Sequence, residues 1–127
     1  MTATAILGGL PAYFHDAHVN LEAAGFWVRG RATAEVTFGV HPQSQPRGIR
    51  LQIHGGPVAT RVRVATPVWS TDVPLTPGQN ASVDVPALDT QRLLPVWMTA
   101  AGGFIPAEHG GPAGDRRLLG CWVEVVP

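Results

Sequence analysis

The sequence contains no lysine and only one cysteine, and charged residues make up 14% of its 127 residues. A single cysteine excludes an internal disulfide framework. Nine arginines balance nine acidic residues, so the formal net charge is zero. A neutral chain lacks the long-range field that draws proteins to nucleic acid or to anionic lipid. We therefore expect no nucleic-acid partner.

Long apolar runs are also missing, although 45% of the side chains are hydrophobic. No run approaches the ~18 residues that a membrane-spanning helix needs, so we expect no membrane insertion by this chain. The first ten residues carry no positive charge, which is atypical of a signal peptide. The length and hydrophobic content are typical of one domain with its own core.

Fifteen glycines and twelve prolines punctuate the chain, and apolar residues between them recur at every second position. Ala34, Val36, Phe38 and Val40 show this pattern clearly. Side chains two residues apart lie on one face of a strand, so each segment buries one face. The pattern predicts about eight short strands, at 26–31, 33–40, 49–54, 58–64, 70–75, 81–85, 95–100 and 119–125.

Strands with one apolar face must pack that face against a second sheet. We therefore expect an all-β fold, an antiparallel β-sandwich of the immunoglobulin-like or jelly-roll type, and the strand order stays open. Residues 1–24 are expected to be an N-terminal segment that caps the sandwich formed by residues 25–127, within a single domain. Thr76-Pro77-Gly78-Gln79 predicts a type II turn. Gly120, inside the last strand, indicates a bulge or a close neighbour.

Histidines near the N-terminus suggest a metal site as one alternative. His15, Asp16 and His18 place two imidazoles and a carboxylate within four residues, and His109 is a candidate further ligand. Zinc sites need three or four converging ligands, and the sequence supplies only this local group. A metal-dependent enzyme that uses these four residues is therefore one hypothesis.

Other catalytic chemistry has little support. The sequence lacks a nucleophile elbow, a phosphate-binding loop and a dinucleotide fingerprint. Cys121 alternates with Val123 and Val125, which predicts a buried and unreactive thiol. We expect no cofactor and no enzymatic activity.

Four tryptophans are many for a domain of this size, and alternation leaves Trp122 and Trp97 on polar faces. An exposed indole beside polar groups is typical of sugar-binding surfaces, because the ring stacks on the apolar face of a pyranose. We expect Trp69, Trp97 and Trp122 to stack on a carbohydrate, with Arg61 and Glu108 as polar contacts.

Two other interpretations of these surfaces stay open. Exposed aromatics also form protein–protein interfaces, which predicts a structural or assembly module whose partner is another protein domain or a further copy of the chain. Arg61 and Arg63 share a strand face, and we expect Glu35 or Glu124 to pair with such arginines across a sheet.

Several short motifs occur in an order that resembles the order in a known module. They are Gly25-Phe26-Trp27-Val28-Arg29-Gly30, His54-Gly55-Gly56-Pro57-Val58, Thr60-Arg61-Val62, Leu75-Thr76-Pro77-Gly78, Gly103-Phe104-Ile105-Pro106-Ala107-Glu108 and Asp115-Arg116-Arg117-Leu118-Leu119-Gly120-Cys121-Trp122-Val123-Glu124. Over roughly Tyr13–Val126 this order resembles the C-terminal β-sandwich accessory module of bacterial membrane glycosyltransferases and related envelope proteins.

The resemblance implies a non-catalytic, extracytoplasmic domain, periplasmic or at the cell surface, that contacts glycan. It transfers no catalytic residues, because the transferase chemistry of such proteins lies in their membrane part. The module often has Asn after the Gly-Pro-Val turn, where this chain has Ala59-Thr60.

Overall fold

The computed structural model describes residues 3–41, 48–88 and 90–126, and these residues form two sheets. One sheet contains six strands: β1 (Ala3–Leu7), β2 (Leu10–Phe14), β5 (Ala32–Gly39), β7 (Thr60–Thr66), β8 (Trp69–Leu75) and β10 (Leu93–Ala100). The other sheet contains five: β3 (Val19–Leu21), β4 (Phe26–Arg29), β6 (Ile49–Gly55), β9 (Asn80–Val85) and β11 (Leu119–Val126). A single 3-10 turn, η1 (Pro106–Glu108), lies between β10 and β11.

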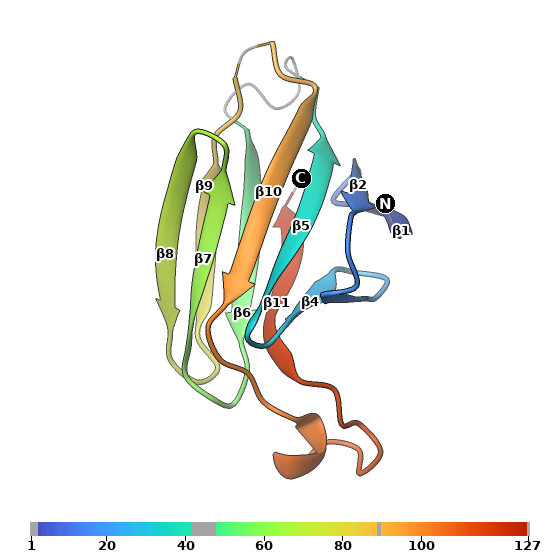
Figure 1. The fold of residues 1–127 in the computed structure, drawn as a ribbon, viewed down its shortest axis with the longest axis vertical. Coiled ribbons are helices and arrows are strands. Elements are labelled where there is room, and N and C mark those ends of the chain that lie inside the picture. Colours follow the sequence, from blue (N-terminus) through green and yellow to red (C-terminus); the bar gives the residue numbers. More distant parts are fainter. Residues whose placement is uncertain (1–2, 42–47, 89, 127) are drawn as a thin grey trace.

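All strand pairs within both sheets are antiparallel. The strand orders are β1-β2-β5-β10-β7-β8 and β3-β4-β11-β6-β9. In Figure 1 the two sheets lie one behind the other as layers, and the connection that carries η1 projects from one end. The predicted all-β, antiparallel sandwich is therefore confirmed.

The core lies between the facing sides of the two sheets. Val36 and Phe38 of β5 face inward from one sheet, Leu51 and Ile53 of β6 face inward from the other, and none of them has exposed surface. Phe14 of β2 and Phe26 of β4 meet edge-on across the sandwich, with ring centroids 5.1 Å apart. Burying one face of every strand leaves the opposite faces, with their polar and aromatic residues, on the outside.

The eight strands expected from alternation correspond to β4 through β11. The described residues contain eleven strands, because residues 3–21 add β1, β2 and β3. β1 and β2 extend the six-stranded sheet, and β3 forms one edge of the five-stranded sheet. The segment that we assigned to a cap thus contributes to both layers. Among the described residues, no helix has the length and hydrophobicity that a membrane crossing requires.

Candidate functional site

Two tryptophans lie side by side on the outer face of the five-stranded sheet. Trp122 of β11 is the ladder partner of Trp27 of β4, and the ring centroids are 5.5 Å apart at an interplanar angle of 58°. Both side chains are half-buried, whereas alternation sends their neighbours Val28 and Val123 into the core. Phe104, from the connection between β10 and β11, packs edge-on against Trp27 with centroids 5.7 Å apart. The three rings form a continuous aromatic surface.

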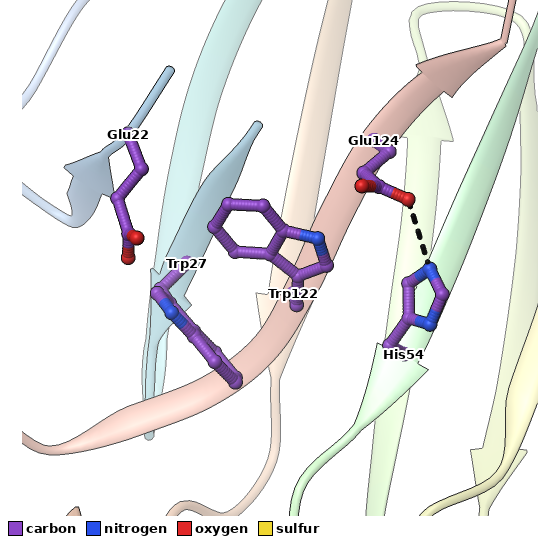
Figure 2. A pocket seen from close by; sticks show the side chains of 5 residues that line it. All are labelled: Glu22, Trp27, His54, Trp122 and Glu124. Atoms are coloured by element: carbon purple, nitrogen blue, oxygen red, sulfur yellow. Dashed lines mark hydrogen bonds and ion pairs between the residues drawn. The ribbon is translucent and has the colours of Figure 1, made fainter. Parts of the chain in front are cut away.

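Polar side chains complete an open pocket of about 360 Å³ around this tryptophan pair. His54 of β6 is the ladder partner of Trp122 on the side away from Trp27. Glu124 follows on the same face of β11, and its Oε2 lies 3.2 Å from His54 Nε2. Glu22, from the turn between β3 and β4, lies on the other side of Trp122, as Figure 2 shows. We call this site, lined by Glu22, Trp27, His54, Trp122 and Glu124, the indole pocket.

Gly25 allows the turn between β3 and β4 to approach the indole pocket closely. A β-carbon at this position would lie 2.2 Å from the carbonyl oxygen of Val123 and 3.0 Å from Cζ2 of Trp122. The turn is closed by the Glu22 N–H, which donates to the Gly25 carbonyl at 2.9 Å. The absence of a side chain at residue 25 therefore lets Glu22 lie beside the indole of Trp122.

Gly120 sets the register of the strand that carries Trp122. The pairing of β11 with β4 shifts between Leu119 and Cys121, and a β-carbon on Gly120 would lie 2.4 Å from the β-carbon of Ala100. The bulge and close neighbour expected for this glycine are therefore both confirmed. Beyond the shift, β11 follows the register that pairs Trp122 with a second indole.

The indole N–H groups divide the outward-facing tryptophans into two kinds. Trp97 of β10 lies on the outer face of the six-stranded sheet, and its Nε1 donates to Glu35 Oε1 at 2.7 Å. Within residues 3–41, 48–88 and 90–126, no acceptor takes a hydrogen bond from Nε1 of Trp27 or Trp122. An indole that is half-exposed and has no protein acceptor can donate to water or to a ligand.

The three tryptophans expected to bind a ligand lie in three different environments. Trp69 of β8 packs against the core, and Trp97 lies on the other sheet from Trp122. Only Trp122 belongs to the indole pocket. The structure therefore does not bring the predicted set together into one surface, and it pairs Trp122 with Trp27 instead.

The predicted polar contacts also lie outside the indole pocket. Arg61 is exposed on β7 of the six-stranded sheet. Glu108, in η1, accepts a hydrogen bond from Arg116 at 3.3 Å.

The expected pairing of strand arginines with Glu35 or Glu124 is wrong, because other residues hold those carboxylates. Glu35 accepts from Trp97, and Glu124 pairs with His54. Arg63 lies 3.9 Å from Asp72, its ladder partner on β8.

The four residues of the metal hypothesis do not converge. In the described part of the chain, no group of three or more His, Cys, Asp or Glu side chains could hold a metal ion. His15 Nε2 lies 2.7 Å from Oγ1 of Thr37, and His18 Nδ1 lies 2.7 Å from the carbonyl oxygen of Thr33. Both imidazoles thus contact β5.

Asp16 and His109 have separate structural contacts. The Asp16 carboxylate accepts from the backbone N–H groups of His18 and Glu35, at 2.9 and 3.0 Å. His109 follows η1 and packs edge-on against Phe104, with ring centroids 6.0 Å apart. Asp16 therefore ties the β2–β3 connection to β5, while His109 contacts the aromatic surface beside the indole pocket.

Cys121 and Asp115 are two further titratable groups whose surroundings shift their pKa values. Cys121 has no exposed surface, and burial raises the pKa of its thiol to about 12. The Arg117 guanidinium donates two hydrogen bonds to the Asp115 carboxylate, at 2.8 and 2.7 Å. These bonds lower the pKa of Asp115 and close the long connection before β11. The buried thiol of Cys121 is a poor nucleophile, and the lowered pKa of Asp115 makes its carboxylate a poor general base.

Sequence reasoning missed most of the indole pocket. Trp27 lies between two buried residues and His54 directly follows the buried Ile53, so alternation places both side chains on an outer face. The adjacency of β4, β11 and β6 joins segments far apart in the sequence, and alternation carries no information about it. Comparisons with models of known families, with curated proteins and with solved structures found no match for this chain.

Proposed function

We propose that this β-sandwich binds carbohydrate at the indole pocket and has no catalytic role. The observation that carries the proposal is the pairing of Trp27 with Trp122 on a solvent-facing sheet, with neither indole N–H engaged by a described residue. A tryptophan face offers a flat apolar surface, and its N–H offers a hydrogen bond at the rim. Carbohydrate rings present the same combination of an apolar face and polar edges.

Polar groups stand where the hydroxyl groups of a stacked sugar would project. Glu22 and Glu124 lie on either side of the Trp122 ring (Figure 2), and each carboxylate can accept hydrogen bonds from hydroxyl groups. The pocket volume of about 360 Å³ lies near the lower end of small-ligand sites. A site this open suits one or two sugar rings of a longer chain and a weak affinity.

A protein–protein interface is the alternative for an exposed aromatic surface. The centres of such interfaces are depleted of Glu, whereas two of the five pocket residues are glutamates. Their charges favour a polar ligand with many hydroxyl groups over an apolar protein surface. If the surface instead mediated assembly, sedimentation would show an oligomer whose population falls when Trp122 is replaced.

The resemblance to modules at the C-terminal end of membrane glycosyltransferases supports an accessory role. A weakly binding, non-catalytic sandwich beside such an enzyme would keep a polysaccharide close to it, because linked weak sites raise the effective concentration of their ligand. This role places the domain outside the cytoplasm, at the bacterial envelope.

Calorimetric titration with a panel of bacterial polysaccharides and oligosaccharides tests the proposal. We expect at least one glycan to bind, and Trp122→Ala to weaken that binding about tenfold or more, as loss of a central tryptophan contact commonly does. Trp97→Phe is the matched control, because Trp97 lies on the other sheet. No binding to any member of the panel would contradict the proposal.

A further inference from the structure

The charged groups of the indole pocket indicate which carbohydrates it takes. Its lining contains two carboxylates, Glu22 and Glu124, one imidazole, His54, and no arginine. His54 contacts Glu124 at 3.2 Å, so one carboxylate has a partner inside the pocket. Because the chain has no lysine, only an arginine could neutralise the other carboxylate with a permanent charge.

Among the described residues, Arg117 and Arg29 are the arginines to consider beside the pocket. Arg117 is close enough to Glu22 for the glutamate to contribute to the raised pKa of the guanidinium, but the largest cause is the pair of hydrogen bonds to Asp115. Asp115 therefore balances the charge of Arg117. Arg29 follows Trp27 by two residues on the outer face of β4 and does not line the pocket. The pocket itself thus keeps an excess of negative charge.

The geometry places these charges beside an open aromatic face. The Trp27 and Trp122 rings contact each other at 5.5 Å between centroids, so a ligand lies on the rings and not between them. A cage that encloses a methylated ammonium needs space between its rings. The two glutamates flank the Trp122 ring instead (Figure 2), where the edge of a stacked sugar would lie.

We propose that the indole pocket selects glycans with free amino groups, in which an ammonium on a sugar ring lies beside Glu22 or Glu124 while the ring stacks on Trp122. The inference rests on the proposed carbohydrate binding and adds the chemical class of the sugar. An ammonium donates charge-assisted hydrogen bonds to a carboxylate and is attracted to an indole face. A uronic acid in the same position would bring a third carboxylate into the pocket, and Glu22 and Glu124 would repel it.

Matched oligosaccharides of glucosamine and N-acetylglucosamine, equal in length and linkage, test this selectivity by calorimetry. At about pH 6 the free sugar amines carry a positive charge that the acetylated amides lack. We expect the amino oligosaccharide to bind about twofold to fivefold more tightly, since an exposed ion pair contributes up to about fivefold. Raising the salt concentration to ~0.5 M should reduce this difference, because salt screens exposed charges.

Glu22→Gln and Glu124→Gln keep the shape of the pocket and remove one charge each. Each should weaken binding of the amino oligosaccharide about twofold to fivefold and leave the acetylated one nearly unchanged. Asp72→Asn, on the outer face of the six-stranded sheet, is the matched control and should change neither affinity.

The outcomes separate the inference from the proposed function. Equal or tighter binding of the acetylated oligosaccharide, or no effect of both glutamine variants, would overturn the inference and leave carbohydrate binding standing. Tighter binding of oligolysine than of the amino oligosaccharide would show that the pocket selects cationic peptides, which also overturns it. Binding to no oligosaccharide at all would overturn both.

Discussion

Glu35 of β5 accepts a 2.7 Å hydrogen bond from the indole N–H of Trp97 on β10. This bond fixes an outward-facing tryptophan to its own sheet. Trp122, on the outer face of the other sheet, has a second indole beside it and no described acceptor for its N–H. The difference between the two environments separates a tryptophan that stabilises the sheet from one that is available to a ligand.

Gly25→Ala should destabilise the domain and disturb the indole pocket. The added β-carbon would meet the carbonyl oxygen of Val123 at 2.2 Å, and a backbone atom cannot rotate away as a side chain can. We expect a loss of about 1–3 kcal/mol in the free energy of unfolding, typical of overpacking. Urea denaturation measures this loss. Gly114→Ala is the control, because a β-carbon there meets nothing within 4 Å, and a similar loss in both variants would contradict the role of Gly25.

Cys121 should not react with thiol reagents in the folded protein. Its thiol is fully buried, and burial raises its pKa to about 12, so no thiolate is available at pH 8. We expect a disulfide-exchange reagent to label Cys121 only after denaturant is added. Rapid labelling of the native chain would contradict the buried position.

The same thiol should make the domain less stable at alkaline pH. The unfolded thiol loses its proton near pH 8.5, while the folded thiol keeps it up to about pH 12. The free energy of unfolding should therefore fall as pH rises from about 8.5 to 10.5. Lysine is absent, so few other groups titrate there. Denaturation of wild type and Cys121→Ala at pH 7 and pH 10 measures the free energy of unfolding. An equal fall between these two pH values in both chains would contradict the prediction.

Asp115 should titrate below the usual range for an aspartate. Hydrogen bonds from the Arg117 guanidinium lower its pKa, so Asp115 stabilises the folded state above its ordinary pKa and loses that contribution as pH falls. An NMR titration of the side-chain carboxyl carbons measures the shift directly. Arg117→Gln should return the pKa of Asp115 toward its usual value, whereas Arg63→Gln should leave it unchanged. A normal value in the wild type would contradict the paired geometry.

Much of the fold could be predicted from the sequence because alternation and turn residues act locally. The type II turn is one example: Gly78 has φ of 73°, and the Gln79 N–H donates to the Thr76 carbonyl at 3.0 Å. The sequence of β2, Leu-Pro-Ala-Tyr-Phe, lacks the alternation of apolar and polar residues that marks the other strands, and Pro11 lies where β2 pairs with β1 but not with β5. A proline is tolerated where no ladder hydrogen bond is needed from it.

The candidate site was harder to predict than the strands that build it. Alternation placed Trp122 on an outer face, and the structure agrees. The partners of Trp122 depend on which strands become neighbours, and Trp27 and His54 come from β4 and β6 on either side of β11. Long-range pairing of this kind follows from the packing of the whole sandwich. The residue type alone could not separate Trp122 from Trp97, because the distinction depends on the acceptor that Glu35 supplies.

NMR detection of the four indole N–H signals during titration with a bound oligosaccharide tests the central claim most directly. We expect the signals of Trp27 and Trp122 to shift together with increasing ligand, while the signal of Trp97 stays in place because its N–H donates to Glu35. Shifts confined to Trp97 or Trp69, or none at any indole despite binding measured by calorimetry, would contradict a carbohydrate site at the indole pocket.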